Sequence, residues 1–114
     1  FLPVRKMLDA GIPVALGTDS MASNDSLNFL EEIRAADKLL SDVSRKEILR
    51  MATQFGAEIL RFPCGQIKPG TKGDLIGFKT GPDYRGDWND IPFEPQRKKV
   101  DFYMVDGKCQ ARLA

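Results

Sequence analysis

The chain has 114 residues, which is enough for one domain of ordinary size or for part of a larger one. Hydrophobic residues make up 42% and charged residues 29%, a globular composition that excludes a disordered chain. The formal net charge of +1 argues against a nucleic-acid-binding protein, and no apolar run approaches the ~18 residues of a membrane span. Two cysteines, Cys64 and Cys109, are too few for a disulfide scaffold, so a reduced, cytoplasmic setting is expected.

The first twenty residues predict the end of a helix, a strand and an acid. Residues 4–10 fit a helix end with Gly11 as its C-terminal cap, and the apolar run 14–16 predicts a short strand buried on both faces of a parallel sheet. One parallel strand cannot form a sheet alone, and the chain begins at Phe1 rather than Met, so we expect a fragment of a longer polypeptide. Asp19 follows the strand directly. Taken alone, its Gly-Thr-Asp-Ser context is more often a turn or a helix cap than a site.

Two helices are expected next. The first starts near Ser23 and Asn24, which are good N-caps. Its predicted buried face consists of Leu27, Leu30, Ile33 and Leu40, and its solvent face of Glu31, Glu32, Arg34 and Lys38. The second helix is expected to begin after Ser44, since Ser44 to Glu47 fits a capping box, and to end at Pro63. Its predicted apolar positions are Ile48, Ala52, Phe55 and Ile59.

From Gly65 onward the pattern is typical of β-structure. A turn at 67–70 leads into a strand over 75–78, and residues 100–113 predict a hairpin around the two-residue turn Asp106-Gly107. Between them lies segment 81–99, which we expect to be an irregular loop that is functional or packs on a missing partner. Its aromatic residues either cover a heterocycle or, more commonly, anchor the loop to the core; they are Tyr84, Trp88 and Phe93.

Several segments occur in an order that is typical of one enzyme superfamily. Residues 10–20 and 22–27 are similar to the last barrel strand and the following helix start of the amidohydrolase superfamily. Residues 48–57 resemble its Met-Ala-Thr…Gly-Ala helix, and residues 65–76 resemble its Gly-x-Ile-x-Pro-Gly return into a β domain. The most similar branch holds cytosine deaminases, chlorohydrolases and adenosine-derivative deaminases, including aminofutalosine deaminase. The resemblance covers the whole chain except 81–99.

This resemblance implies an α/β fold. Residues 1–62 would form the last strand and terminal helices of a (β/α)8 metal-dependent hydrolase barrel, and residues 63–114 the C-terminal strands of a small composite β-sandwich. Gly73 stands where alanine is usual, and Gly77 where a larger apolar residue is common. The resemblance makes Asp74 a structural turn carboxylate.

The resemblance also implies the chemistry of Asp19. In such enzymes a divalent metal, here expected to be zinc with iron as the alternative, lowers the pKa of its bound water to ~7. Since the sequence has no histidine, most metal ligands are expected outside this chain. Asp19 would be the metal ligand and catalytic proton carrier, and Ser20, equally well explained as a turn hydroxyl, would bind substrate. The expected reaction is hydrolytic deamination. The expected substrate is a small heterocyclic molecule, either a nucleobase or an adenosine-type nucleoside derivative.

Two alternatives stay open. One is a chlorohydrolase or other C–N hydrolase on the same scaffold, because pocket residues elsewhere choose the substrate. The other is a non-enzymatic α/β binding module in which Asp19 is only a cap. Under the leading hypothesis the 114 residues alone are expected to be inactive. The unpaired strand edge and the apolar helix faces favour pairing with another copy of the chain.

Overall fold

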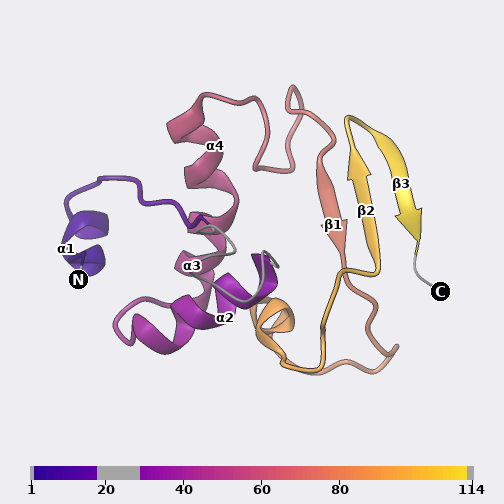
Figure 1. Cartoon of the computed structure of the whole chain (residues 1–114). Coiled ribbons are helices and arrows are strands. Elements are labelled where there is room, and N and C mark those ends of the chain that lie inside the picture. The colour runs from indigo at the N-terminus through magenta and orange to yellow at the C-terminus, as the bar shows by residue number, and fades with distance from the viewer. Residues whose placement is uncertain (1, 18–28, 113–114) are drawn as a thin grey trace, which may run out of the picture.

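Helices and a small sheet stand side by side in the computed structural model, which describes residues 2–17 and 29–112 (Figure 1). The elements are α1 (Val4–Asp9), α2 (Phe29–Leu39), α3 (Arg45–Ala52), α4 (Gln54–Leu60), β1 (Leu75–Gly77), the 3₁₀-helix η1 (Trp88–Phe93), β2 (Phe102–Val105) and β3 (Lys108–Arg112). No helix within these residues is long and apolar enough to cross a membrane. The predicted start of the first long helix, with Ser23, Asn24 and Leu27, lies outside the described residues.

The cap predicted at Gly11 is confirmed. Gly11 has φ of +77°, its N–H donates to the Leu8 carbonyl at 3.0 Å, and the Ile12 N–H donates to the Met7 carbonyl at 2.9 Å. This pair of hydrogen bonds is the Schellman motif, which satisfies the last carbonyls of a helix. The chain therefore leaves α1 in a fixed direction.

The strand predicted over 14–16 does not form among the described residues. A parallel strand needs the N–H and C=O groups of a neighbour, and β1, β2 and β3 pair only with one another here. Instead the Leu16 N–H donates to the Met51 carbonyl at 3.1 Å, and Val14 and Leu16 pack on the core. Figure 1 shows this segment running from α1 to the point where α3 meets α4.

The core lies between α2, α3 and η1. Its buried residues are Val4, Leu30, Ile33, Ala36, Val43, Ile48, Met51 and Phe93. Ile48 and Met51 are the most enclosed, at 0% and 1% exposure, as the apolar spacing predicts for Ile48. The prediction for Ile59 is wrong, since it is 48% exposed. The predicted second helix is two helices, and in α4 Phe55 packs on the core and Ala57 is buried, whereas Ile59 lies outside this face.

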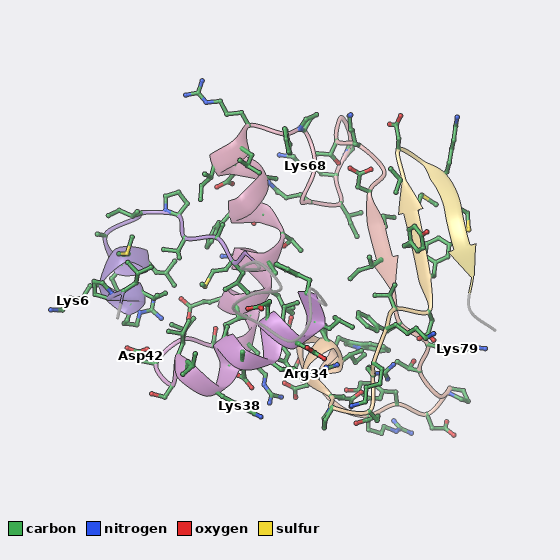
Figure 2. The ribbon with its side chains drawn as sticks, in the orientation of Figure 1. Lys6, Arg34, Lys38, Asp42, Lys68 and Lys79 are labelled. Atoms are coloured by element: carbon green, nitrogen blue, oxygen red, sulfur yellow. The ribbon has the colours of Figure 1, made fainter. Side chains whose placement is uncertain are left out.

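The prediction that Arg34 faces water is also wrong. Its guanidinium donates to the Arg97 carbonyl, and its Nε is buried without a hydrogen-bond partner. The cause is η1, which packs on α2 and covers this face. In Figure 2, Lys38 points away from the molecule, whereas Arg34 lies where α2 meets η1.

Segment 81–99 is more regular than predicted. Asp87 caps η1 by accepting the Asn89 N–H at 2.8 Å, and Ile91 and Phe93 are buried. Arg45 of α3 holds the segment in place: it bonds Asp37 of α2 and Asp90 of η1, and its guanidinium lies 4.9 Å from the centre of the Phe93 ring. The ion pairs of Arg45 and the burial of Ile91 and Phe93 therefore hold the segment against α2 and α3.

The predicted hairpin is confirmed. The sheet is antiparallel in the order β1-β2-β3, and the turn residues Asp106 and Gly107 have φ of 50° and 77°. Two positive φ values are the mark of a type I′ turn. The turn is held from outside, since the Asp106 N–H donates to Asp74 Oδ1 at 2.7 Å and the Gly107 N–H to the Gly73 carbonyl at 2.9 Å. Asp74 therefore has the structural role expected of it.

Replacing Gly107 by alanine should weaken the hairpin. A side chain at φ of +77° is strained, so Gly107→Ala should lower the free energy of unfolding by about 1 kcal/mol. Gly81→Ala is the matched control, because a Cβ there meets no atom within 4 Å and φ is not positive. Urea unfolding of the two variants measures the difference. Equal stability of both variants would contradict the type I′ geometry.

Arg5 ties α1 to the first turn of α3. Its guanidinium lies 2.8 Å from Asp9 Oδ1 and 2.9 Å from Glu47 Oε2, and it donates to the Asp42 carbonyl. Glu47 also completes the predicted capping box, which is confirmed: the Ser44 N–H donates to Glu47 Oε1 and the Glu47 N–H donates to Ser44 Oγ, both at 3.1 Å. The Arg5 bond, followed by the Ser44 N–H, lowers the pKa of Glu47 from 4.5 to about 2.

The Glu47 pKa predicts an acid-sensitive contribution to stability. Because the folded pKa lies below the unfolded value, the ionised carboxylate stabilises the fold fully above pH 4.5, and this contribution is lost as pH falls toward about 2. Glu47→Gln should therefore be less stable than the wild type at pH 7, and the difference should shrink over that acid range. Glu31→Gln, at an exposed position of α2, is the control. A constant difference between pH 7 and 2 in urea unfolding would refute the assignment.

Candidate functional site

Both predicted site residues lie outside the described part of the chain. Asp19 and Ser20 follow Gly17, which is the last described residue of the N-terminal segment. Their roles therefore stay predictions. The structure does show the contacts of segment 14–17, the stretch that leads to Asp19.

Segment 14–17 contacts the junction of α3 and α4. The Leu16 N–H bonds the Met51 carbonyl, and a Cβ added to Gly56 would lie 3.8 Å from the Ala15 Cβ. That distance is ordinary van der Waals contact, so Ala15 lies against α4 beside Gly56. These contacts hold the chain three and four residues before Asp19.

The junction itself is a break at Thr53, whose φ of −130° and ψ of −81° are not helical. The carbonyls at the end of a helix need partners from outside the helix. At this break the Thr53 hydroxyl donates to the Leu49 carbonyl at 2.7 Å, and the Thr53 N–H donates to the Arg50 carbonyl at 3.3 Å. At the same break the Met51 carbonyl accepts the hydrogen bond from the Leu16 N–H.

The turn after α4 holds the junction from its other side. Gly65 has φ of +88°, and a Cβ there would lie 2.8 Å from both the Ala57 Cβ and the Thr53 carbonyl oxygen. Only glycine fits this position without a shift. Residues 51–57 are therefore enclosed between the segment that leads to Asp19 and the turn that leads to the sheet.

A hollow of about 530 Å³ opens between this junction and the sheet. Its lining is mainly apolar and consists of Ala52, Thr53, Gly65, Gln66, Ile67, Asp74, Leu75, Ile76, Tyr103, Met104 and Val105. The one carboxylate in the lining, Asp74, is already bonded to the Asp106 N–H. The hollow thus offers a packing surface, and its described lining brings no acid and base together.

The described residues do not fit a catalytic metal site. Residues 2–17 and 29–112 contain no group of three or more His, Cys, Asp or Glu side chains that could hold a metal ion. The whole sequence has no histidine, and Cys64 and Cys109 are both free thiols. A catalytic zinc normally takes three protein ligands. Asp19 would therefore be one donor of a set completed elsewhere.

The aromatic residues of segment 81–99 divide into two groups. Phe93 is buried under Arg45 and anchors the segment to the core, so it does not cover a substrate. Tyr84 and Trp88 form a tilted pair with ring centroids 5.1 Å apart, and the Tyr84 hydroxyl donates to the Asp87 carbonyl. Trp88 is 66% exposed. This pair lies on the surface.

Thr53 and the Met51 carbonyl are the residues that the sequence analysis missed. The apolar spacing of 48, 52, 55 and 59 predicts one continuous helix, in which Thr53 would be an ordinary surface residue. A signal was present, since a β-branched residue with a hydroxyl can bond the carbonyl four residues earlier. That signal is too common in helices to predict a break by itself.

Comparison with known proteins gives one consistent result. The sequence profile of the amidohydrolase family matches residues 1–109. The 5-methylthioadenosine/S-adenosylhomocysteine deaminase of Dictyoglomus thermophilum is 48% identical over 118 residues, covering 93% of this chain and 28% of that protein. The zinc-complexed atrazine chlorohydrolase of Arthrobacter aurescens has a TM-score of 0.80 at 29% identity, covering 96% of this chain and 27% of that one.

A solved deaminase completes the comparison. Helicobacter pylori aminofutalosine deaminase has a TM-score of 0.74 at 28% identity, covering 96% of this chain and 28% of that one. This chain spans less than a third of the length of each of these proteins. The profile match runs through segment 14–17, the Thr53 junction and strands β1 and β2. The chain therefore belongs to the amidohydrolase family.

Proposed function

We propose that this chain is part of a metal-dependent hydrolase that deaminates an adenosine-type nucleoside derivative. The observation that carries the proposal is the 48% identity to a 5-methylthioadenosine/S-adenosylhomocysteine deaminase along nearly the whole chain. The geometry supports it, since the backbone that leads to Asp19 is held by a hydrogen bond and by the core rather than left as a surface loop. A carboxylate that moves a proton needs a fixed position.

The same proposal assigns the two parts of the chain. Residues 1–62 would be the end of a (β/α)8 barrel and residues 63–114 the strands of a composite β-sandwich. Two observations support this division. Segment 14–17 has no strand partner among the described residues, and the sheet leaves Ile76 and Val105 58% and 50% exposed. Both would be covered by further strands of the same polypeptide. The expected pairing with a second copy and the cytoplasmic setting stay predictions.

Asp19 is the proposed catalytic and metal-binding residue, and Ser20 the proposed substrate-binding residue. In hydrolytic deamination the oxygen of water bonds to the ring carbon, the C–N bond breaks, and ammonia leaves. The Asp19 carboxylate would take the proton from the attacking water and deliver it to the leaving nitrogen. The metal, zinc in the first place and iron as the alternative, would be held mostly by residues outside these 114. The zinc in the chlorohydrolase structure supports this choice.

Dechlorination is the second candidate reaction, favoured by the TM-score of 0.80 to atrazine chlorohydrolase. The leaving group separates the two candidates. The zinc-loaded gene product that contains this chain should release ammonia from 5-methylthioadenosine or S-adenosylhomocysteine and no chloride from atrazine. Chloride release without ammonia would replace the first candidate by the second. Release of neither product would favour the other alternative, a non-enzymatic α/β binding module.

Removing the charge of Asp19 should abolish most of the activity. In that gene product Asp19→Asn should keep the fold and lower kcat by roughly 10²–10⁴-fold, the usual contribution of a general acid–base residue. Asp42→Asn, which changes an exposed carboxylate between α2 and α3, should keep full activity. Circular dichroism controls for folding. Full activity of Asp19→Asn would make Asp19 structural.

The 114-residue chain alone should neither turn over these nucleosides nor retain zinc. The reason is the lack of a histidine anywhere in it and of a metal-binding cluster among residues 2–17 and 29–112. Metal analysis after gel filtration and an ammonia assay test this expectation. Turnover by a carrier-free sample would overturn the assignment of the missing ligands to the rest of the polypeptide.

A further inference from the structure

We propose that Asp106 is a site of spontaneous isomerisation to isoaspartate, and that Gly73 and Asp74 hold this reaction back while the sheet is folded. Asp106-Gly107 is the only Asp-Gly pair in the sequence. Glycine has no Cβ to shield its backbone nitrogen, which leaves that nitrogen accessible to the preceding carboxyl group. Both turn residues are exposed, so water reaches them. This modification is independent of the hydrolytic reaction proposed above.

The modification needs no reactant other than water. The Gly107 nitrogen bonds to the Asp106 Cγ, and the hydroxyl of the protonated carboxyl group leaves with the amide proton as water. The product of this step is a cyclic imide. Water then adds to one of the two ring carbonyls, and the C–N bond at that carbonyl breaks. When the backbone carbonyl is the one cleaved, the chain afterwards runs through Cβ and Cγ, which is isoaspartate. No atom is gained or lost overall, and no group is oxidised or reduced.

The geometry of the turn opposes ring closure. For the ring to form, the Asp106 Cβ and the Gly107 nitrogen must be nearly eclipsed about the Cα–C bond of Asp106. The φ values of 50° and 77° are those of a type I′ turn, whose first central residue has ψ of about +30°. At that ψ the Cβ and the next nitrogen lie nearly opposite each other. Asp106 therefore reacts only after its backbone rotates out of the turn.

Two hydrogen bonds from outside the hairpin hold the backbone in this turn. The Gly107 N–H, on the attacking nitrogen, donates to the Gly73 carbonyl at 2.9 Å, and the Asp106 N–H donates to Asp74 Oδ1 at 2.7 Å. The approach is close, since a Cβ added to Gly73 would lie 3.0 Å from the Gly107 nitrogen. Both acceptors directly precede β1, whose pairing with β2 holds them against the turn. Local opening of this contact is therefore the step that permits the reaction.

Isoaspartate at position 106 would destroy the turn. It adds one carbon to the backbone of a two-residue loop, and the length of the loop sets the register of a hairpin. The hydrogen bonds to Gly73 and Asp74 depend on the same register, so they would be lost with it. The product therefore marks copies of the protein in which this end of the sheet has opened.

The test follows isoaspartate in the full gene product that contains this chain. Trypsin cuts after Lys99 and Lys108, so residues 100–108 are released as one peptide. Its isoaspartyl form has the same mass and separates from it by chromatography, and fragmentation assigns the change to Asp106 or to Asp101. The folded protein and the synthetic peptide 100–108 are incubated at the same neutral pH and compared.

Three variants separate the effect of Asp74 from a general change in stability. Asp74→Ala removes the acceptor, whereas Asp74→Asn keeps an oxygen that can accept the Asp106 N–H. Asp101→Ala is the matched control, because Asp101 Oδ2 also accepts a backbone N–H, that of Lys79, at 2.6 Å. Asp101 stands at the opposite end of β2 from the turn.

The expected result is that Asp106 isomerises at least roughly tenfold faster in the free peptide than in the folded protein, because the turn must open first. In the folded protein Asp74→Ala should raise the rate roughly three- to tenfold, as the loss of one hydrogen bond allows. Asp74→Asn and Asp101→Ala should leave the rate unchanged.

Each contrary outcome overturns a defined part of the proposal. Absence of isoaspartate at Asp106 in the peptide would overturn the site, and equal rates in peptide and folded protein would overturn the protection by the turn. An unchanged rate in Asp74→Ala, or an equal acceleration in Asp101→Ala, would overturn the role of Asp74. If Asp74→Ala does not fold, the comparison of the peptide with the wild type still decides whether the turn protects Asp106.

Discussion

The arrangement of the chain depends on one interruption, the break between α3 and α4 at Thr53. In a continuous helix the Met51 carbonyl would have bonded an N–H of the next turn. The break turns this carbonyl outward to hold Leu16, and it places the Thr53 carbonyl against Gly65, where a Cβ would come within 2.8 Å. Segments that precede and follow the helices are thereby fixed to the same point. The stretch 51–57, which belongs to the Met-Ala-Thr…Gly-Ala motif, therefore makes contacts with both of these segments.

Three arginines compensate for a small core. Arg5 joins α1 to α3, Arg45 joins α2, α3 and η1, and Arg97 joins Glu94 to the Lys79 carbonyl beside β1. Each guanidinium has several donors in a rigid plane and can therefore bond two or three segments at once. Isolated surface ion pairs contribute little, but bidentate and shared ones fix geometry. Their main effect here is to set how the elements meet.

Local sequence signals predicted local structure well. The Schellman cap at Gly11, the capping box of Ser44 and Glu47, and the turn at Asp106-Gly107 depend on neighbouring residues and are confirmed. The features that were wrong depend on distant residues. Arg34 bonds the carbonyl of Arg97, 63 positions later, and segment 14–16 has no strand neighbour within residues 2–17 and 29–112. The candidate site follows the same division. The structure describes segment 14–17, which leads to the site, whereas Asp19 and Ser20 stay predictions because they lie outside the described residues.

The contact between Asp74 and the hairpin turn has a consequence for the order of folding. This hydrogen bond joins residues 32 positions apart, and β1 pairs with β2 across the whole of segment 81–99. The helices, by contrast, form from contacts between near neighbours in the sequence. Closing a long loop costs chain entropy before its contacts repay it. The pairing of β1 with β2 is thus expected to be the slow, high-contact-order step, and burial of Ile91 and Phe93 shortens the loop that it must close.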